Sequence, residues 1–141
     1  MQNWIVLALL SMFFAGLTSV IAKFGLKGGI SADLGLAVRT VIVFIFVTLN
    51  FFAWQNVKQI GLLTKSNLLY LGISGITTSL SWIFYYRAIK IGNVSQVALI
   101  DKGSILITLL LSFTLLKEPV TPKIMLGAGL ILAGLIVLAM K

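Results

Sequence analysis

Cysteine and histidine are both absent from this chain of 141 residues, and only three of its side chains are acidic. Without thiols or imidazoles the chain can form no disulfide, has no soft metal ligand and has no Cys or His to act as a nucleophile or base. Three carboxylates also leave almost nothing for hydrolytic chemistry. We therefore expect that the protein is not an enzyme and that it holds no metal and no cofactor.

Charged residues are scarce as well, at 10% of the chain, whereas 60% of the residues are hydrophobic. The apolar residues gather in five long runs, at residues 4–22, 35–54, 68–86, 95–116 and 123–140. Each run approaches the ~20 residues that a helix needs to cross about 30 Å of hydrocarbon. A soluble domain of this size has too little interior to bury five such helices. The sequence predicts an all-α, polytopic membrane protein whose five transmembrane helices form one domain over residues 1–141.

The basic residues give a net charge of +8, but they are dispersed singly near the ends of the apolar runs. Lysine and arginine at such places anchor helix ends among lipid headgroups. We therefore expect the lipid bilayer, and not nucleic acid, to be the partner of these charges.

Hydroxyl groups follow one face of the third run and one face of the fourth. At about 100° per residue, the following side chains of the third run fall on one side of a helix: Ser74, Thr77, Thr78, Ser81, Tyr85 and, at its edge, Trp82. In the fourth run the corresponding group is Asp101, Ser104, Thr108 and Ser112. Two such stripes favour a shared polar pathway for a substrate. The alternative is that the hydroxyls only pack between helices and bond to their own backbone.

Asp101 is the one acidic residue inside any apolar run. If the fourth helix begins near Ser95, Asp101 lies about 9 Å below that point, where a charge costs on the order of 3 kcal/mol and needs a partner. Arg39 approaches from the same side of the membrane, and Lys102 is adjacent, so either could pair with it. The pair could fix the register of the helices, or Asp101 could bind a substrate or a proton; the residues leave both open.

Several short motifs occur in a characteristic order along the chain. They are Tyr85-Tyr86-Arg87-Ala88-Ile89-Lys90, Asn93-Val94-Ser95-Gln96-Val97, Leu99-Ile100-Asp101-Lys102-Gly103-Ser104, Lys117-Glu118 and Gly127-Ala128-Gly129. Over nearly the whole chain this order resembles one EamA-type repeat of the drug/metabolite transporter superfamily, as in its short single-repeat members. Two features depart from that pattern. Lys117 stands where the superfamily often has glycine, and no proline precedes Glu118, so the helix kink of relatives is not expected here.

The resemblance implies transport of a small metabolite or amphipathic solute across the inner membrane. Larger members contain two five-helix repeats inserted in opposite orientations, so one repeat implies an antiparallel pair, either a homodimer or a pair with a second chain. An odd number of helices places the termini on opposite sides. One side then carries Lys58, Lys65, Lys117 and Lys123, and the other carries Lys23, Lys27, Arg39, Arg87, Lys90 and Lys141. Such a small difference is a weak orientation signal, so we expect dual topology and alternating access.

Two other functions compete with this interpretation. A small multidrug-resistance exporter of organic cations fits less well, because residues 1–32 contain no acidic side chain that could serve as its buried glutamate. A non-transporting membrane subunit or assembly factor would carry the same hydroxyl stripes with no hydrated cavity. The identity of the substrate, an amphoteric metabolite or an organic cation, stays open, as does coupling to protons or to sodium.

Overall fold

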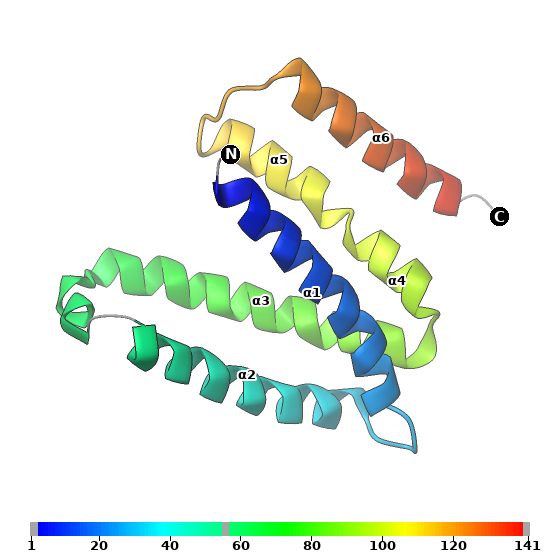
Figure 1. Ribbon diagram of the computed structural model, residues 1–141. Helices are drawn as coiled ribbons and strands as arrows, with labels where there is room; N and C mark the ends of the chain where they lie inside the picture. The colour runs from blue at the N-terminus through cyan, green and yellow to red at the C-terminus, as the bar shows by residue number, and fades with distance from the viewer. Residues whose placement is uncertain (1–2, 55–56, 140–141) are drawn as a thin grey trace. The chain divides into compact units, whose positions relative to one another are not determined.

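The computed structural model describes residues 3–54 and 57–139, and this part of the chain is helical with no strand. The elements are α1 (Asn3–Gly25), α2 (Ala32–Trp54), the 3₁₀ helix η1 (Val57–Leu62), α3 (Lys65–Ile91), α4 (Val94–Asp101), α5 (Ser104–Thr114) and α6 (Pro122–Ala139) (Figure 1). The predicted all-α class is confirmed.

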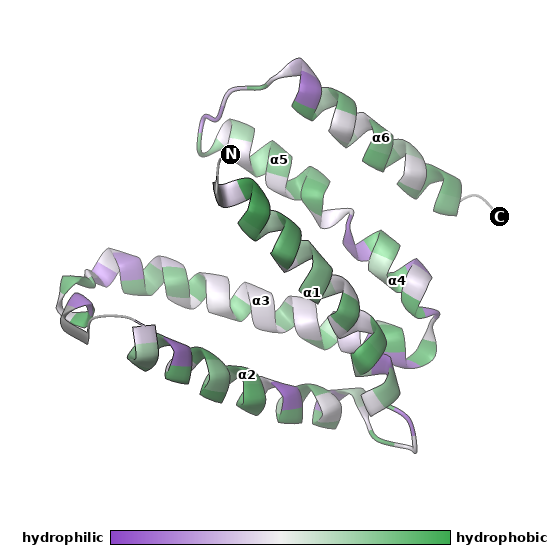
Figure 2. Cartoon of the chain, viewed as in Figure 1, coloured by the Kyte–Doolittle hydropathy of each residue, from purple (hydrophilic) through white to green (hydrophobic). Residues whose placement is uncertain are grey.

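Most of the large apolar side chains lie on the outside of the helices. Four spans are long and apolar enough to cross a bilayer, the fourth of them being α4 and α5 together, and α6 is a shorter apolar helix. The hydrophobic colour covers these helices over most of their length (Figure 2). Exposed apolar surface on this scale is unfavourable in water and is stable against lipid. The chain is therefore a polytopic membrane protein.

The helices continue beyond the apolar runs that predict them. The second helix begins at Ala32, which places Asp33 in its first turn. The third helix ends at Ile91, beyond the apolar run at residues 68–86, so it includes Arg87 and Lys90. A hydropathy run marks the part of a helix in hydrocarbon, whereas the backbone hydrogen bonds extend into the headgroup region, where charged side chains are solvated. The helix ends one residue before Gly92, a residue type that favours the end of a helix.

The fourth span contains an interruption that the sequence interpretation did not predict. Lys102 and Gly103 separate α4 from α5, with φ,ψ values of −64°, −14° and −58°, −22°. The N–H of Gly103 donates to the carbonyl of Ile100 at 2.9 Å, and that of Ile105 to Lys102 at 3.1 Å. These i→i+3 bonds form a short 3₁₀ turn, which breaks the α-helical ladder without a proline. The prediction of one uninterrupted helix over residues 95–116 is wrong at this point.

The chain divides into two compact units, Met1–Ile91 and Gly92–Lys141. In the first unit α2 and α3 run side by side in opposite directions, and α1 also contacts α3 (Figure 1). Its buried residues gather where α1 ends, α2 begins and α3 ends: Leu26, Ala32, Leu36, Tyr86 and Ile89. In the second unit α6 packs along both α4 and α5.

The turn between α1 and α2 closes the buried end of the first unit. Gly28 and Gly29 adopt φ values of 75° and 84°, which side chains disfavour and glycine tolerates. The two glycines thus bring the start of α2 back towards the end of α1.

Candidate functional site

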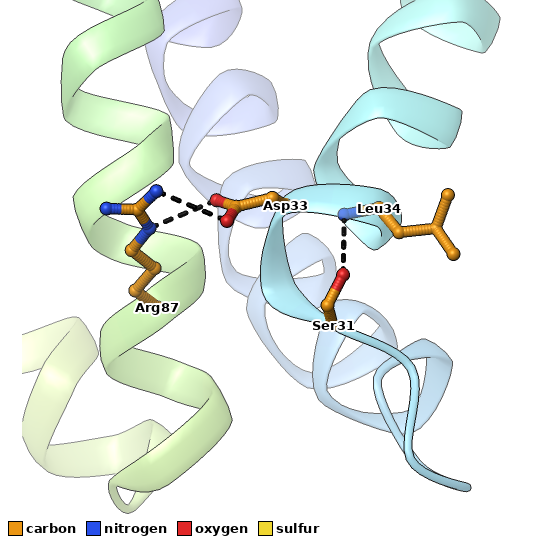
Figure 3. A network of polar contacts seen from close by, with 4 residues as sticks. All are labelled: Ser31, Asp33, Leu34 and Arg87. Atoms are coloured by element: carbon orange, nitrogen blue, oxygen red, sulfur yellow. Dashed lines mark hydrogen bonds and ion pairs between the residues drawn. The ribbon is translucent and has the colours of Figure 1, made fainter.

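An ion pair joins the start of α2 to the end of α3. The Nε of Arg87 donates to Oδ1 of Asp33 at 3.0 Å, and its Nη2 donates to Oδ2 at 3.2 Å (Figure 3). Ser31 stabilises the same helix start, because its Oγ accepts a hydrogen bond from the N–H of Leu34 at 3.2 Å. The two parallel bonds fix the direction of the Arg87 guanidinium. The sequence interpretation missed this pair. Two signals could have indicated it: acidic residues are scarce, and the connections after the first and third apolar runs lie on the same side of the membrane.

Two lysines bond to backbone carbonyls at the same end of the unit. The Nζ of Lys23 donates to the carbonyls of Ile89 at 2.5 Å and Lys90 at 3.2 Å, and Lys90 in turn donates to the carbonyl of Leu26 at 2.6 Å. Carbonyls in the last turn of a helix lack intrahelical partners, and positive charge near them is favourable. These two lysines therefore tie α1 to α3, a role beyond the lipid anchoring expected from the sequence.

Arg39 lies one third of the way along α2 and faces α3. Its Cζ sits over the ring of Trp82, 4.3 Å from the ring centroid, and 5.7 Å from the centroid of Tyr86. Tyr86 is buried, whereas Arg39 and Trp82 are half-buried. Within residues 3–54 and 57–91, Arg39 makes no hydrogen bond and no ion pair. The predicted site residues Arg39 and Trp82 are thus neighbours.

Two grooves flank this cluster. The first, of about 510 Å³, runs between α1 and α2 and is almost entirely apolar; its lining includes Thr18, Ala22, Leu26, Leu34, Val38, Arg39 and Tyr86. The second, of about 780 Å³, lies between α2 and α3; its lining includes Asp33, Thr40, Phe44, Ser79, Trp82 and Arg87. Both volumes fall within the ~300–1,000 Å³ typical of small-molecule sites. Arg39 is the charged residue of the first groove, and Trp82 is an aromatic wall of the second.

The hydroxyl stripe of α3 divides into two parts. Thr77 and Thr78 both donate to the carbonyl of Ser74, at 2.9 and 2.8 Å, and these three residues and Ser81 are exposed. Towards the end of the helix, the hydroxyl of Tyr85 donates to Oγ of Ser19 on α1 at 2.7 Å. The threonines thus satisfy their donors within their own helix, while their acceptor lone pairs stay available. That this stripe lines a hydrated pathway stays a prediction.

Asp101 ends α4 directly before the interruption of the fourth span. Its Oδ2 lies 3.9 Å from Nζ of Lys102, a loose contact between two partly exposed side chains. On α5, Thr108 donates to the carbonyl of Ser104 at 3.1 Å. The 3₁₀ turn lies between Asp101 and Ser104, so their alignment on one face stays a prediction, whereas Ser104 and Thr108 share one face of α5. Arg39 belongs to the first unit and Asp101 to the second, so their pairing stays a prediction.

Comparisons with known proteins match the chain over nearly its whole length. Residues 2–140 match the model of the EamA-like transporter family. A protein of Sinorhizobium sp. named "Uncharacterized transporter in cobO 3'region" is 36% identical over 141 residues, which cover 98% of this chain and 97% of that protein. No solved structure matches the chain. The extent of the family match and the similarity to a protein of the same length show that this chain is a membrane protein of the EamA-like transporter family.

Proposed function

We propose that the protein is a secondary transporter of a small metabolite or amphipathic solute, working in the inner membrane as an antiparallel, dual-topology homodimer with alternating access. The observation that carries the proposal is the length of the family match. The chain supplies one repeat of five apolar spans, and its 36% identical relative is covered over 97% of its own length by that same single repeat. A second copy inserted upside-down would supply the inverted repeat of a central pathway.

The exposed polar side chains support pairing with a second copy. Ser74, Thr77, Thr78 and Ser81 are exposed on α3, and Ser104 and Thr108 are exposed on α5. Polar groups facing lipid are unfavourable, whereas the same groups between helices can hydrogen-bond to a partner or to water in a cavity. A second copy that covers both faces would turn the two stripes into the walls of one pathway. The small difference in positive charge between the two sides allows that copy to insert upside-down.

The interruption between α4 and α5 suits alternating access. Short 3₁₀ segments within a helix mark places where the two halves can change their angle. Asp101 ends one half and Ser104 begins the other, so a change of angle there would move a carboxylate relative to the hydroxyls of α5. We propose that Asp101 binds the substrate or the coupling proton at this hinge.

Transport by the purified protein in sealed vesicles tests the proposal. Wild-type vesicles with an imposed pH gradient are screened for uptake and efflux of radiolabelled amino acids, carboxylates and organic amines. We expect accumulation of at least one class above that of protein-free vesicles, and a fall of tenfold or more in Asp101→Asn, because the substitution removes the charge and keeps the shape. Each tenfold loss corresponds to about 1.4 kcal/mol.

Glu118→Gln is the matched control, because it also converts a carboxylate to an amide but lies in the exposed loop before α6. This variant should transport as the wild type does. If no solute crosses in any wild-type preparation, the non-transporting membrane subunit becomes the better interpretation. If Asp101→Asn transports normally, Asp101 is not the binding group.

A further inference from the structure

Arg39 is a membrane-embedded cation that lacks an anion. It is the eighth residue of α2, about 10 Å from the start of the helix. Asp33 is the acidic residue of the first unit, and its carboxylate already accepts hydrogen bonds from Nε and Nη2 of Arg87. An arginine at this depth costs on the order of 3 kcal/mol on insertion scales and ordinarily has a partner. Residues 3–54 and 57–91 hold Arg39 only through aromatic rings.

The aromatic contacts leave the hydrogen-bonding edge of Arg39 available. A guanidinium over a ring is attracted through its positive charge, and an indole ring offers no oxygen or nitrogen acceptor to its N–H groups. Trp82, at 4.3 Å, therefore fixes the position of the group without satisfying its donors. A planar, fixed fork of N–H groups matches two oxygens of a carboxylate or of a phosphate, and a carboxylate is the less polar of the two beside an apolar groove. The site is prepared for an anion.

The groove beside Arg39 fits an apolar tail. Arg39 is the one charged residue in the lining of this groove of about 510 Å³, and most of the remaining lining is aliphatic, including Ile21, Leu34, Val38 and Ile42. A ligand with its carboxylate at Arg39 can therefore place hydrocarbon along α1 and α2. A purely polar anion would gain the charge contact but would leave this surface without a partner.

We propose that Arg39, held over Trp82, binds the carboxylate of an amphipathic organic anion whose apolar part lies in the groove between α1 and α2. The inference rests on the proposed transport function, because it assigns the chemical class of the solute that the transporter binds. It narrows the substrates to organic acids and to amphoteric molecules with a carboxylate, and it excludes simple organic cations.

Binding can be measured without any transport step. The full chain is placed in nanodiscs of phosphatidylcholine, and equilibrium dialysis follows radiolabelled octanoate, with octylammonium as the probe of opposite charge and equal chain length. We expect saturable binding of octanoate and none of octylammonium. Arg39→Gln should weaken octanoate binding by at least about tenfold, because hydrogen bonds to charged groups contribute strongly. Arg39→Lys should weaken it as well, because an ammonium cannot form the two parallel bonds.

Lys27→Gln is the matched control. Lys27 is also a cation over an aromatic ring, with its Nζ 4.4 Å from the centroid of Phe24, but it is exposed and lies outside the groove lining. This variant loses the same unit of charge and should bind octanoate within about twofold of the wild type. An equal loss in Lys27→Gln and Arg39→Gln would overturn the proposal, since the effect would then be general electrostatics. If Arg39→Gln does not fold, Arg39→Lys carries the comparison.

Three further outcomes would overturn the inference. One is equal octanoate affinity in the wild type and both Arg39 variants. Another is displacement of octanoate when phosphatidylglycerol is added to the nanodiscs, with enrichment of that lipid dependent on Arg39, which would identify a lipid headgroup as the occupant. The third is binding that arises only in Asp101→Asn, which would identify Asp101 as the internal counter-ion. If octanoate does not bind but another solute is transported, this inference fails and the proposed function stands. If octanoate binds but no solute is transported, the binding site stands and the proposed function fails.

Discussion

The two arginines of this chain have different environments although each makes a contact between α2 and α3. Arg87 has its donors paired with Asp33 in a fork of two bonds, and both side chains are exposed at the end of the unit. Arg39 is half-buried against Trp82 and Tyr86 and keeps its donors available. The first arrangement joins two helix ends, whereas the second leaves a charged group that can bind something else. Arg87 thus makes a structural contact, whereas Arg39 forms a candidate binding site.

Two isoleucines of α3 differ in burial, so their substitution measures how much packing at the buried end contributes to stability. Ile89 is 0% exposed and Ile91 is 90% exposed. Ile89→Ala should lower the free energy of unfolding by about 2 kcal/mol or more, because the cavity forfeits packing contacts on all sides. Ile91→Ala removes the same atoms from the same helix and should change it by less than about 0.5 kcal/mol. Denaturant unfolding in detergent, followed by circular dichroism, gives both values, and equal effects would contradict the position of Ile89 in the core.

At the scale of elements, α3 is the longest helix and the one that both other long helices of its unit contact. Its 27 residues extend about 40 Å, which exceeds the hydrocarbon thickness of about 30 Å, so its charged ends reach the headgroups or the helix tilts. The additional length is what brings Arg87 and Lys90 into contact with the ends of α2 and α1. The fourth span is not one continuous helix, because the turn at Lys102 and Gly103 divides it into α4 and α5.

Gly103 allows this turn to pack against α6. A Cβ at this position would lie 3.0 Å from the carbonyl oxygen of Ile100 and 3.2 Å from Cδ1 of Leu135. Gly103→Val should therefore destabilise the protein by about 1–3 kcal/mol through overpacking. Leu135→Ala alone should also destabilise it, but in the Gly103→Val background it should recover part of the loss, since it clears one of the two contacts. A double-mutant cycle measures this coupling, and strict additivity would show that Gly103 and Leu135 do not meet.

At the scale of the whole molecule, orientation decides what kind of assembly can form. With five spans, as the sequence predicts, four basic residues lie on one side and six on the other, so we expect little energetic preference for either orientation. In a family whose larger members contain inverted repeats, insertion both ways would let one gene product supply both halves.

Labelling of single cysteines from outside intact cells tests the orientation, because the chain has no cysteine of its own. Ser66→Cys in the first turn of α3 and Asn93→Cys between α3 and α4 lie on opposite sides, are exposed and leave the charge balance unchanged. Dual topology predicts partial labelling at both positions. Full labelling at one position with none at the other would exclude the antiparallel homodimer and would favour a second chain as the partner.

The sequence by itself determined the membrane class, the apolar spans and the resemblance to the EamA-type repeat, and the glycine turn and the helix end before Gly92 are equally local features. These features depend on composition and on residues close together in the chain, where hydropathy, glycine conformation and helix ends act locally. The cap at Thr121 belongs with them, since its Oγ1 accepts from the N–H of Ile124 at 3.3 Å.

The tertiary structure alone decided which side chains meet. Asp33 and Arg87 are 54 residues apart, and Arg39 meets Trp82 only because α2 and α3 adopt particular rotations about their axes. Those rotations result from many weak packing contacts, none of which a single sequence specifies. The turn at Lys102 and Gly103 was missed for a related reason. No proline marks the break, and the close approach of Gly103 to Leu135 exists only once α6 has packed against the fourth span.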